Sequence, residues 1–175
     1  MSLSRPLPGE FDPAYGAYLA EAPEGDVLAL LEAQGREIQA LYGGLGKGQG
    51  NHRYAPGKWS LKDLLLHLTD AERIFAYRCL RIGRGDETPL PGFDEEAFAT
   101  AGQADARTVG DLLGEFLAVR QASLSLFRGL PPEAWTRRGT TNGRAITARC
   151  VPFLCLGHAA HHLAVIRERY ASALK

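Results

Sequence analysis

Apolar residues recur at helical spacing in four segments of the chain, and regions rich in glycine and proline separate these segments. Within each segment the apolar positions repeat every three or four residues, which places them on one face of an α-helix. The pattern predicts helices over residues 26–42, 61–81, 109–127 and 152–173. No segment shows the sustained apolar–polar alternation of a strand, so we predict an all-α protein.

Polar residues at three of the predicted helix starts support these boundaries. Asp26 is a favourable N-cap for the first helix. Ser60 with Asp63, and Thr108 with Asp111, have the spacing of a capping hydroxyl followed by an acidic residue in the first helical turn. We therefore expect the helices to begin where the apolar pattern begins.

Four amphipathic helices in one short chain favour a four-helix bundle. The connection between the second and third helices, about 27 residues long, is long for a bundle and predicts a crossover or lid. Residues 94–99 within it are compatible with a short helical turn. We expect a single domain over residues 1–175, with its core at about residues 26–171.

Composition and charge exclude several classes of protein. The 175 residues include 20 Lys plus Arg and 20 Asp plus Glu, so the chain is formally neutral. Without a basic cluster it is not expected to bind nucleic acid or an anionic membrane. No apolar run reaches the ~18 residues that span a bilayer, and the N-terminus lacks the apolar stretch of a signal peptide, so we expect a cytoplasmic protein. We expect Cys79, Cys150 and Cys155 to be buried, reduced thiols.

Two histidines occupy the middle of the apolar face of the predicted fourth helix. His158 and His162 are four residues apart, so they lie about 40° and about 6 Å apart on that helix and point into the bundle. A buried imidazole without a partner costs about 1–3 kcal/mol, and one metal ion bound by both would remove this cost. Hydrogen bonds to other core side chains are the alternative. His161 lies at the edge of the face, so we expect it to flank or support the site.

His67 on the second predicted helix also faces inward and is the candidate third ligand. Asp63 and Asp70 flank it; either could orient its ring through the second nitrogen, or could cap the helix or face solvent. His52, in a glycine-rich loop, is expected to be exposed.

Three imidazoles leave open positions on a metal ion, for water or for a substrate thiol. Imidazole suits Zn, Ni, Cu, Fe and Mn, so the donors do not fix the metal; we expect Zn or Ni, with Mn or Fe as alternatives. Because a metal binds the neutral ring, its affinity is expected to fall as the pH drops through the histidine range near 6.5.

Two stretches of sequence carry a family resemblance. The first stretch is YAPGKWS at residues 54–60, just before the second predicted helix, together with HLTDAE at 67–72 inside that helix. The second stretch is GHAAHH at 157–162 with IRERY at 166–170, and it lies in the fourth predicted helix. Both stretches, in this order, resemble the DinB/YfiT-like family over most of residues 26–171. The resemblance implies a four-helix bundle with an up-up-down-down crossover, a homodimer, and a divalent metal held by His67, His158 and His162.

The resemblance also implies an activity. Members of this family are described as metal-dependent hydrolases, and some relatives as transferases or isomerases that use low-molecular-weight thiols such as bacillithiol or mycothiol. We therefore expect a metal-dependent thiol transferase or hydrolase that acts on a small electrophile. Arg169 is a candidate contact for an anionic group of the thiol, or else a surface residue at the edge of the apolar face. A non-catalytic metal-binding stress-response protein, and a helical scaffold that binds no metal, are the alternatives.

Overall fold

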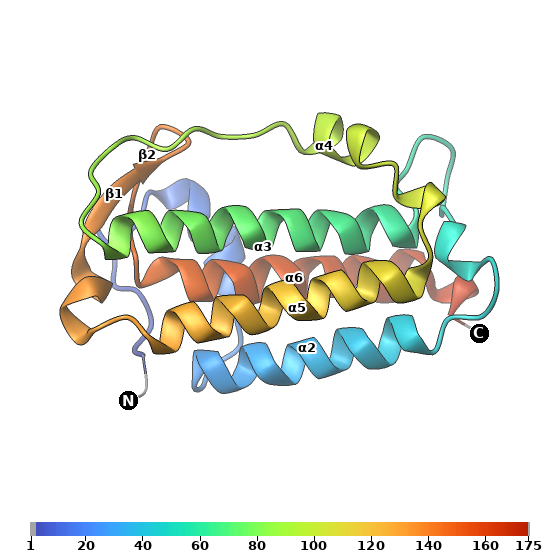
Figure 1. Ribbon diagram of the computed structural model, residues 1–175, viewed down its shortest axis with the longest axis horizontal. Helices are drawn as coiled ribbons and strands as arrows, with labels where there is room; N and C mark the ends of the chain where they lie inside the picture. Colours follow the sequence, from blue (N-terminus) through green and yellow to red (C-terminus); the bar gives the residue numbers. More distant parts are fainter. Residues whose placement is uncertain (1–2, 175) are drawn as a thin grey trace.

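The computed structural model describes residues 3–174 as a bundle of four long helices, with shorter elements packed along it and at its ends (Figure 1). The long helices are α2 (Val27–Gly43), α3 (Leu61–Gly83), α5 (Val109–Arg128) and α6 (Cys150–Arg169). Their bounds agree with the predicted ranges to within a few residues, so the helical bundle is confirmed. Among the described helices, none combines the length and the apolar character that crossing a membrane requires.

The predicted N-caps form the expected hydrogen bonds. Asp26 accepts hydrogen bonds from the second and third N–H groups of α2 at 2.9 and 3.2 Å. Ser60 and Asp63 form a complete capping box, in which each side chain accepts a hydrogen bond from the other residue's backbone N–H. Thr108 accepts one from the N–H of Asp111 at 3.1 Å. These caps satisfy N–H groups that have no partner inside a helix, which is why the boundaries could be predicted.

The long helices run up, down, down and up in chain order, since α3 and α5 are parallel and α2 and α6 are opposed to them (Figure 1). The up-up-down-down order implied by the resemblance is therefore wrong as an order along the chain. A parallel pair needs a long return connection, and the segment after α3 provides it. This crossover contains α4 (Glu95–Gly102) and the 3-10 turn η3 (Ala104–Ala106), so the helical turn expected at 94–99 is confirmed and extended.

A short N-terminal helix and a β-hairpin, both outside the long helices, were missed by the sequence pattern. The turn η1 (Pro13–Tyr15) leads into the short helix α1 (Gly16–Glu21), which packs on α6. The strands β1 (Arg138–Thr141) and β2 (Arg144–Thr147) pair in antiparallel register, from Arg138 opposite Thr147 to Thr141 opposite Arg144. Four-residue strands are too short to show sustained alternation. The remaining 3-10 turns are η2 (Gln49–Asn51), η4 (Pro132–Thr136) and η5 (Ala171–Ala173).

The core consists of two apolar clusters along the bundle, separated by a buried polar layer. One cluster includes Leu31 and Phe127, and the other includes Ile38 and Phe116. On α2, α5 and α6 the polar residue lies between the two clusters; on α3 this is true of Glu72, whereas His67 lies among residues of the second cluster. The polar layer consists of Gln34, Glu72, Arg120, His67 and His158.

Gly157 allows α1 to lie directly against α6. A Cβ atom on Gly157 would lie 1.8 Å from the carbonyl oxygen of Tyr18, so Gly157→Ala is expected to displace α1 and to lower the free energy of unfolding by about 1–3 kcal/mol. Gly114 on α5 is the matched control, because a Cβ atom there meets nothing within 4 Å. Gly114→Ala should stabilise the protein by about 0.5–1 kcal/mol. Urea unfolding measures both, and changes of the same sign would contradict this account.

Candidate metal centre

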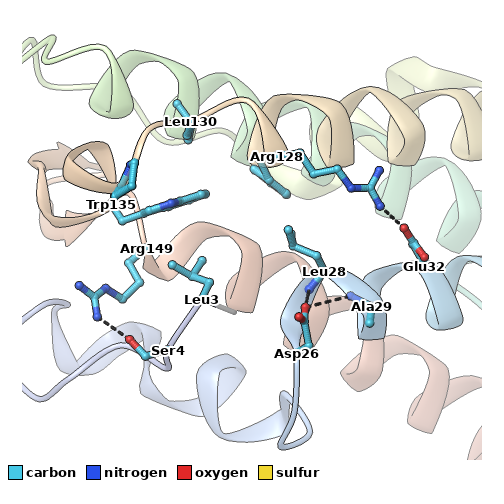
Figure 2. Close-up of a pocket in the computed structure, with 12 residues that line it drawn as sticks. Leu3, Ser4, Asp26, Leu28, Ala29, Glu32, Arg128, Leu130, Trp135 and Arg149 are labelled. Atoms are coloured by element: carbon cyan, nitrogen blue, oxygen red, sulfur yellow. Dashed lines mark hydrogen bonds and ion pairs between the residues drawn. The ribbon is translucent and has the colours of Figure 1, made fainter. Parts of the chain in front are cut away.

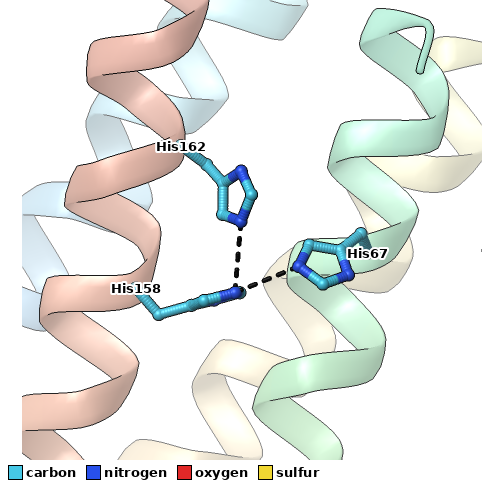
Figure 3. A group of neighbouring side chains, drawn as sticks. All are labelled: His67, His158 and His162. Carbon is cyan, nitrogen blue, oxygen red and sulfur yellow. Dashed lines mark hydrogen bonds between the residues drawn. The ribbon is translucent and has the colours of Figure 1, made fainter. Parts of the chain in front are cut away.

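Three imidazoles from two helices converge inside the bundle (Figure 3). His67 comes from α3, and His158 and His162 lie one turn apart on α6. The Nε2 atom of His158 lies 3.0 Å from Nε2 of His67 and 3.2 Å from Nε2 of His162. One nitrogen from each residue lies within 4.8 Å of the other two. The structure thus brings together the three residues that the sequence singled out.

Hydrogen bonds alone do not satisfy this cluster. A neutral imidazole has one N–H donor and one lone pair on its two nitrogens. Nε2 of His158 faces two other Nε2 atoms, so in either tautomer it forms a well-directed hydrogen bond with only one of them. Nδ1 of His162 is buried, with no hydrogen-bond partner among the described residues. The alternative of paired core histidines therefore leaves polar atoms unsatisfied.

The donor atoms fit a metal ion. Nitrogens bound to one ion at about 2.0–2.1 Å, with angles near 90–110°, would lie about 2.9–3.4 Å apart. The two separations from Nε2 of His158, 3.0 and 3.2 Å, fall within this range, and all three donor atoms lie within 4.8 Å of one another. Three neutral nitrogens are a donor set for a divalent ion of the zinc or nickel kind, and they leave part of its coordination shell open.

Burial keeps these imidazoles neutral. His67 and His158 are 7% and 6% exposed. Desolvation lowers the pKa of His67 to about 4. It also lowers the pKa of His162 to about 3, with the neighbouring His67 as a second cause, and holds the pKa of His158 well below its ordinary value. Neutral imidazole is the form that binds metal, so proton competition is expected well below the pH of 6.5 that the sequence suggested.

The same shifts predict that the metal-free protein loses stability as the pH falls from 7 to 5. The unfolded chain binds protons on its imidazoles below pH about 6.5, whereas the folded chain does not until its lowered pKa values are reached. Since the unfolded state takes up more protons, each of His67 and His162 lowers the free energy of unfolding by about 2 kcal/mol between pH 7 and pH 5. Urea unfolding with a chelator present measures the loss. His162→Leu should reduce it, and an unchanged pH dependence would contradict the burial of a neutral ring.

The two flanking carboxylates contact other groups. Asp63 belongs to the capping box of α3 and pairs with Arg53 at 3.1 Å. Asp70 lies 3.5 Å from Arg73. Among residues 3–174, neither carboxylate hydrogen-bonds to an imidazole. The alternatives of a helix cap for Asp63 and a solvated helix face for Asp70 describe what they do in this structure.

The other candidate residues are placed differently. His161 flanks the site as expected, with its ring 5.3 Å from that of His162. His52 is half-buried against Tyr170, so the expectation that it is exposed is wrong. Arg169 is exposed at the end of α6, where it pairs with the neighbouring Glu168 at 3.1 Å.

Two small cavities reach the imidazoles. One of about 210 Å³ opens beside His162, and one of about 140 Å³ reaches His158. Aromatic rings line the approach: Trp59 lies 4.7 Å from the ring of His67, and Phe75 lies 5.6 Å from that of His158. Neither aromatic residue was predicted to belong to the site, although Trp59 lies within the YAPGKWS stretch at residues 54–60.

A larger cavity lies elsewhere. It measures about 600 Å³ and lies where α2 begins and α5 ends, beside Trp135 (Figure 2). Four of its polar groups form two pairs, Arg128 with Glu32 and Arg149 with Ser4. None of the three converging histidines lines it. Size alone therefore does not identify the chemical site.

Comparison with solved structures supports the fold. YfiT from Bacillus subtilis, described as a probable metal-dependent hydrolase with an unusual four-helix bundle topology, superposes with a TM-score of 0.74 at 20% identity, over 83% of this chain and 85% of that one. The mycothiol-dependent maleylpyruvate isomerase superposes with a TM-score of 0.67 at 15% identity, over 84% of this chain and 61% of that one. A search of curated proteins gave no significant match.

Comparison with family models places the sequence itself. The model of the DinB superfamily matches residues 30–166, which include all four long helices in whole or in large part. The matched range also contains His67, His158 and His162. The chain therefore belongs to the DinB superfamily.

Proposed function

We propose that this protein is a metalloenzyme in which His67, His158 and His162 hold one divalent ion, zinc or nickel, and that it transfers a low-molecular-weight thiol to a small electrophile. The observation that carries the proposal is the convergence of three imidazoles in which Nε2 of His158 lies 3.0 and 3.2 Å from the Nε2 atoms of His67 and His162, beside two cavities. When bound, such an ion would lower the pKa of a thiol or water at its open position and so supply a nucleophile at neutral pH.

A thiol cosubstrate is preferred because the chain offers no reactive thiol of its own. All three cysteines are buried. Burial raises the pKa of Cys79 to about 12 and that of Cys155 well above its ordinary value, so neither forms the reactive thiolate at neutral pH. The nucleophile would therefore arrive with the cosubstrate or be water. One similar structure is named as a mycothiol-dependent isomerase and the other as a probable hydrolase, which supports both chemistries.

The protein side chains position the reactants and limit access by water. The cavity beside His162 is the proposed place for the thiol, and Lys58 lines it together with Tyr54 and Trp59. Lys58 is thus better placed than Arg169 to meet an anionic group of the thiol. In the cavity that reaches His158, the rings of Phe75 and Tyr18 stand edge-on to His158 and shield it from solvent.

Thiol transfer to 1-chloro-2,4-dinitrobenzene tests this function. The thiol sulfur bonds to the ring carbon, chloride leaves with the C–Cl electron pair, and the thiol proton passes to solvent. With bacillithiol or mycothiol, we expect thioether formation that a chelator abolishes, followed by its absorbance. The non-catalytic metal-binding stress-response protein remains the alternative, and it predicts bound metal without turnover of this or any hydrolysable substrate.

Assembly and location stay predictions from the sequence. We propose a cytoplasmic homodimer. Light scattering that gives the mass of a single 19.0 kDa chain at every concentration would contradict the dimer.

A further inference from the structure

Arg78 on α3 is a buried cation without a counter-charge. The residue is only 7% exposed. Nη2 donates a hydrogen bond to the carbonyl oxygen of Pro91 at 2.7 Å, and no carboxylate among the described residues pairs with it. A guanidinium has five N–H donors and stays charged in proteins, so most of its binding capacity is unused. The N–H groups that lack a protein partner are not among the buried polar atoms, and the residue lines a cavity, so these groups are free to pair with an anionic ligand there.

The other buried arginine shows what a satisfied guanidinium looks like in this fold. Arg120 is bonded to both carboxylate oxygens of Glu72 at 2.7–2.9 Å. It also donates to the carbonyl oxygen of Leu31 at 2.7 Å and lies 3.3 Å from the amide oxygen of Gln34. Arg78 has one such partner, and it differs from Arg120 in lining a cavity.

That cavity connects Arg78 with His158. Its volume is about 140 Å³. Ala71, Phe75 and Arg78 follow one another along α3 at about one turn each, so this wall is about 10 Å long. Leu154 and His158, one turn apart on α6, also line the cavity. A molecule bound here would have its charged end at Arg78 and its other end at the imidazole cluster.

The rest of the lining favours a small organic anion over an inorganic one. Phe75, Phe93 and Leu154 provide apolar surface for a carbon skeleton. The charges of the exposed residues Arg144 and Glu95 cancel, so Arg78 gives the cavity lining a net positive charge. The volume is well below the ~300 Å³ of pockets that take drug-sized ligands, which limits the occupant to a short chain.

We infer that this cavity binds a short-chain carboxylic acid, with Arg78 as the receptor for its carboxylate and its carbon skeleton directed at His158. The planar guanidinium fork pairs with a carboxylate through two parallel hydrogen bonds. In naming the class of electrophile, the inference rests on the proposed function. The binding of the carboxylate itself requires no metal ion, so it is tested separately.

Crotonate and crotonamide test the inference on the chelator-treated protein. They share a four-carbon skeleton and differ in the charge of the head group. We expect NMR titration to show that crotonate shifts signals of the cavity residues and binds at least tenfold more tightly than crotonamide. This comparison uses the unaltered chain, so it does not depend on how a variant folds. Equal affinity for the two compounds, or no binding of either, would overturn the inference.

Two matched variants locate the charge that matters. Arg78→Met keeps the length of the side chain without its charge, and it should weaken crotonate binding at least tenfold. Arg84→Met, at an exposed arginine that follows α3 and does not line the cavity, should change it less than threefold. A zinc titration of the same samples separates the two proposals. If the protein binds zinc but binds crotonate and crotonamide equally well, only the carboxylate site is overturned. If it prefers crotonate but binds no zinc, only the proposed function is overturned.

Discussion

Replacing His158 with alanine is expected to abolish stoichiometric metal binding. Its Nε2 atom is the one that lies within 3.0 and 3.2 Å of both other Nε2 atoms, so its loss leaves two nitrogens on different helices. Loss of a supporting residue around a metal ligand already costs about 10–100-fold in affinity, so loss of the ligand itself should exceed 100-fold. Calorimetric titration with zinc and with nickel, and metal analysis of the dialysed protein, measure the change.

Thermal unfolding provides a second measurement of the same substitution. A ligand that binds only the folded state stabilises it by about 2.7 kcal/mol at a concentration 100 times its dissociation constant. The unaltered protein should therefore melt at a higher temperature when zinc is added, and the His158→Ala variant should not. His161→Ala is the matched control, because His161 lies on the same helix beside His162 but outside the converging cluster. His52→Ala is a second control, because His52 follows the turn η2 and also lies outside the cluster.

The two control variants test whether the metal ligands are assigned to the right histidines. Both control variants should keep one metal ion per chain and the metal-dependent rise in melting temperature. Full metal content in His158→Ala, or its loss in His52→Ala, would show that the assignment is wrong. Comparing the metal-free proteins separates the loss of a ligand from the loss of packing around His158.

The long helices could be predicted because their signals are local. Apolar spacing and capping residues such as Asp26 and Ser60 act within one or two turns, so the sequence alone contains the information. The same periodicity placed His67, His158 and His162 on inward faces. Their convergence depends on the antiparallel packing of α3 against α6, which periodicity does not specify and the family resemblance implied.

The features that were missed depend on distant contacts or on short signals. The hairpin β1–β2 has strands too short to alternate, and its signal was the pair Asn142-Gly143, whose positive φ angles of 52° and 71° form the tight turn. The burial of Arg78 and Arg120 has no local signal, because a charged residue on a helix is buried or exposed according to what packs across from it. Gln34, which interrupts the apolar face of α2, was the visible hint of the polar layer.

Replacing Glu72 with leucine is expected to lower the free energy of unfolding by about 3–5 kcal/mol, because it leaves the charge of Arg120 buried and unpaired. Both side chains are 4% exposed, and Arg120 donates three hydrogen bonds to Glu72. A domain of this size has about 5–15 kcal/mol of stability in total, so such a loss would unfold much of a marginal protein. Urea unfolding of the metal-free protein measures it.

The double variant Glu72→Leu with Arg120→Met distinguishes an unpaired charge from a lost contact. If the penalty comes from the unpaired guanidinium, removing it should restore most of the stability, since an apolar pair of similar size often replaces a buried ion pair without loss. The surface pair Arg107 and Asp111 provides the control, and Asp111→Ala should cost less than about 1 kcal/mol. A double variant as unstable as Glu72→Leu would show that the pair also stabilises the fold through its bonds to α2. In that case zinc affinity should fall in both variants, because the amide of Gln34 connects Arg120 to the backbone of α6 two residues before His158.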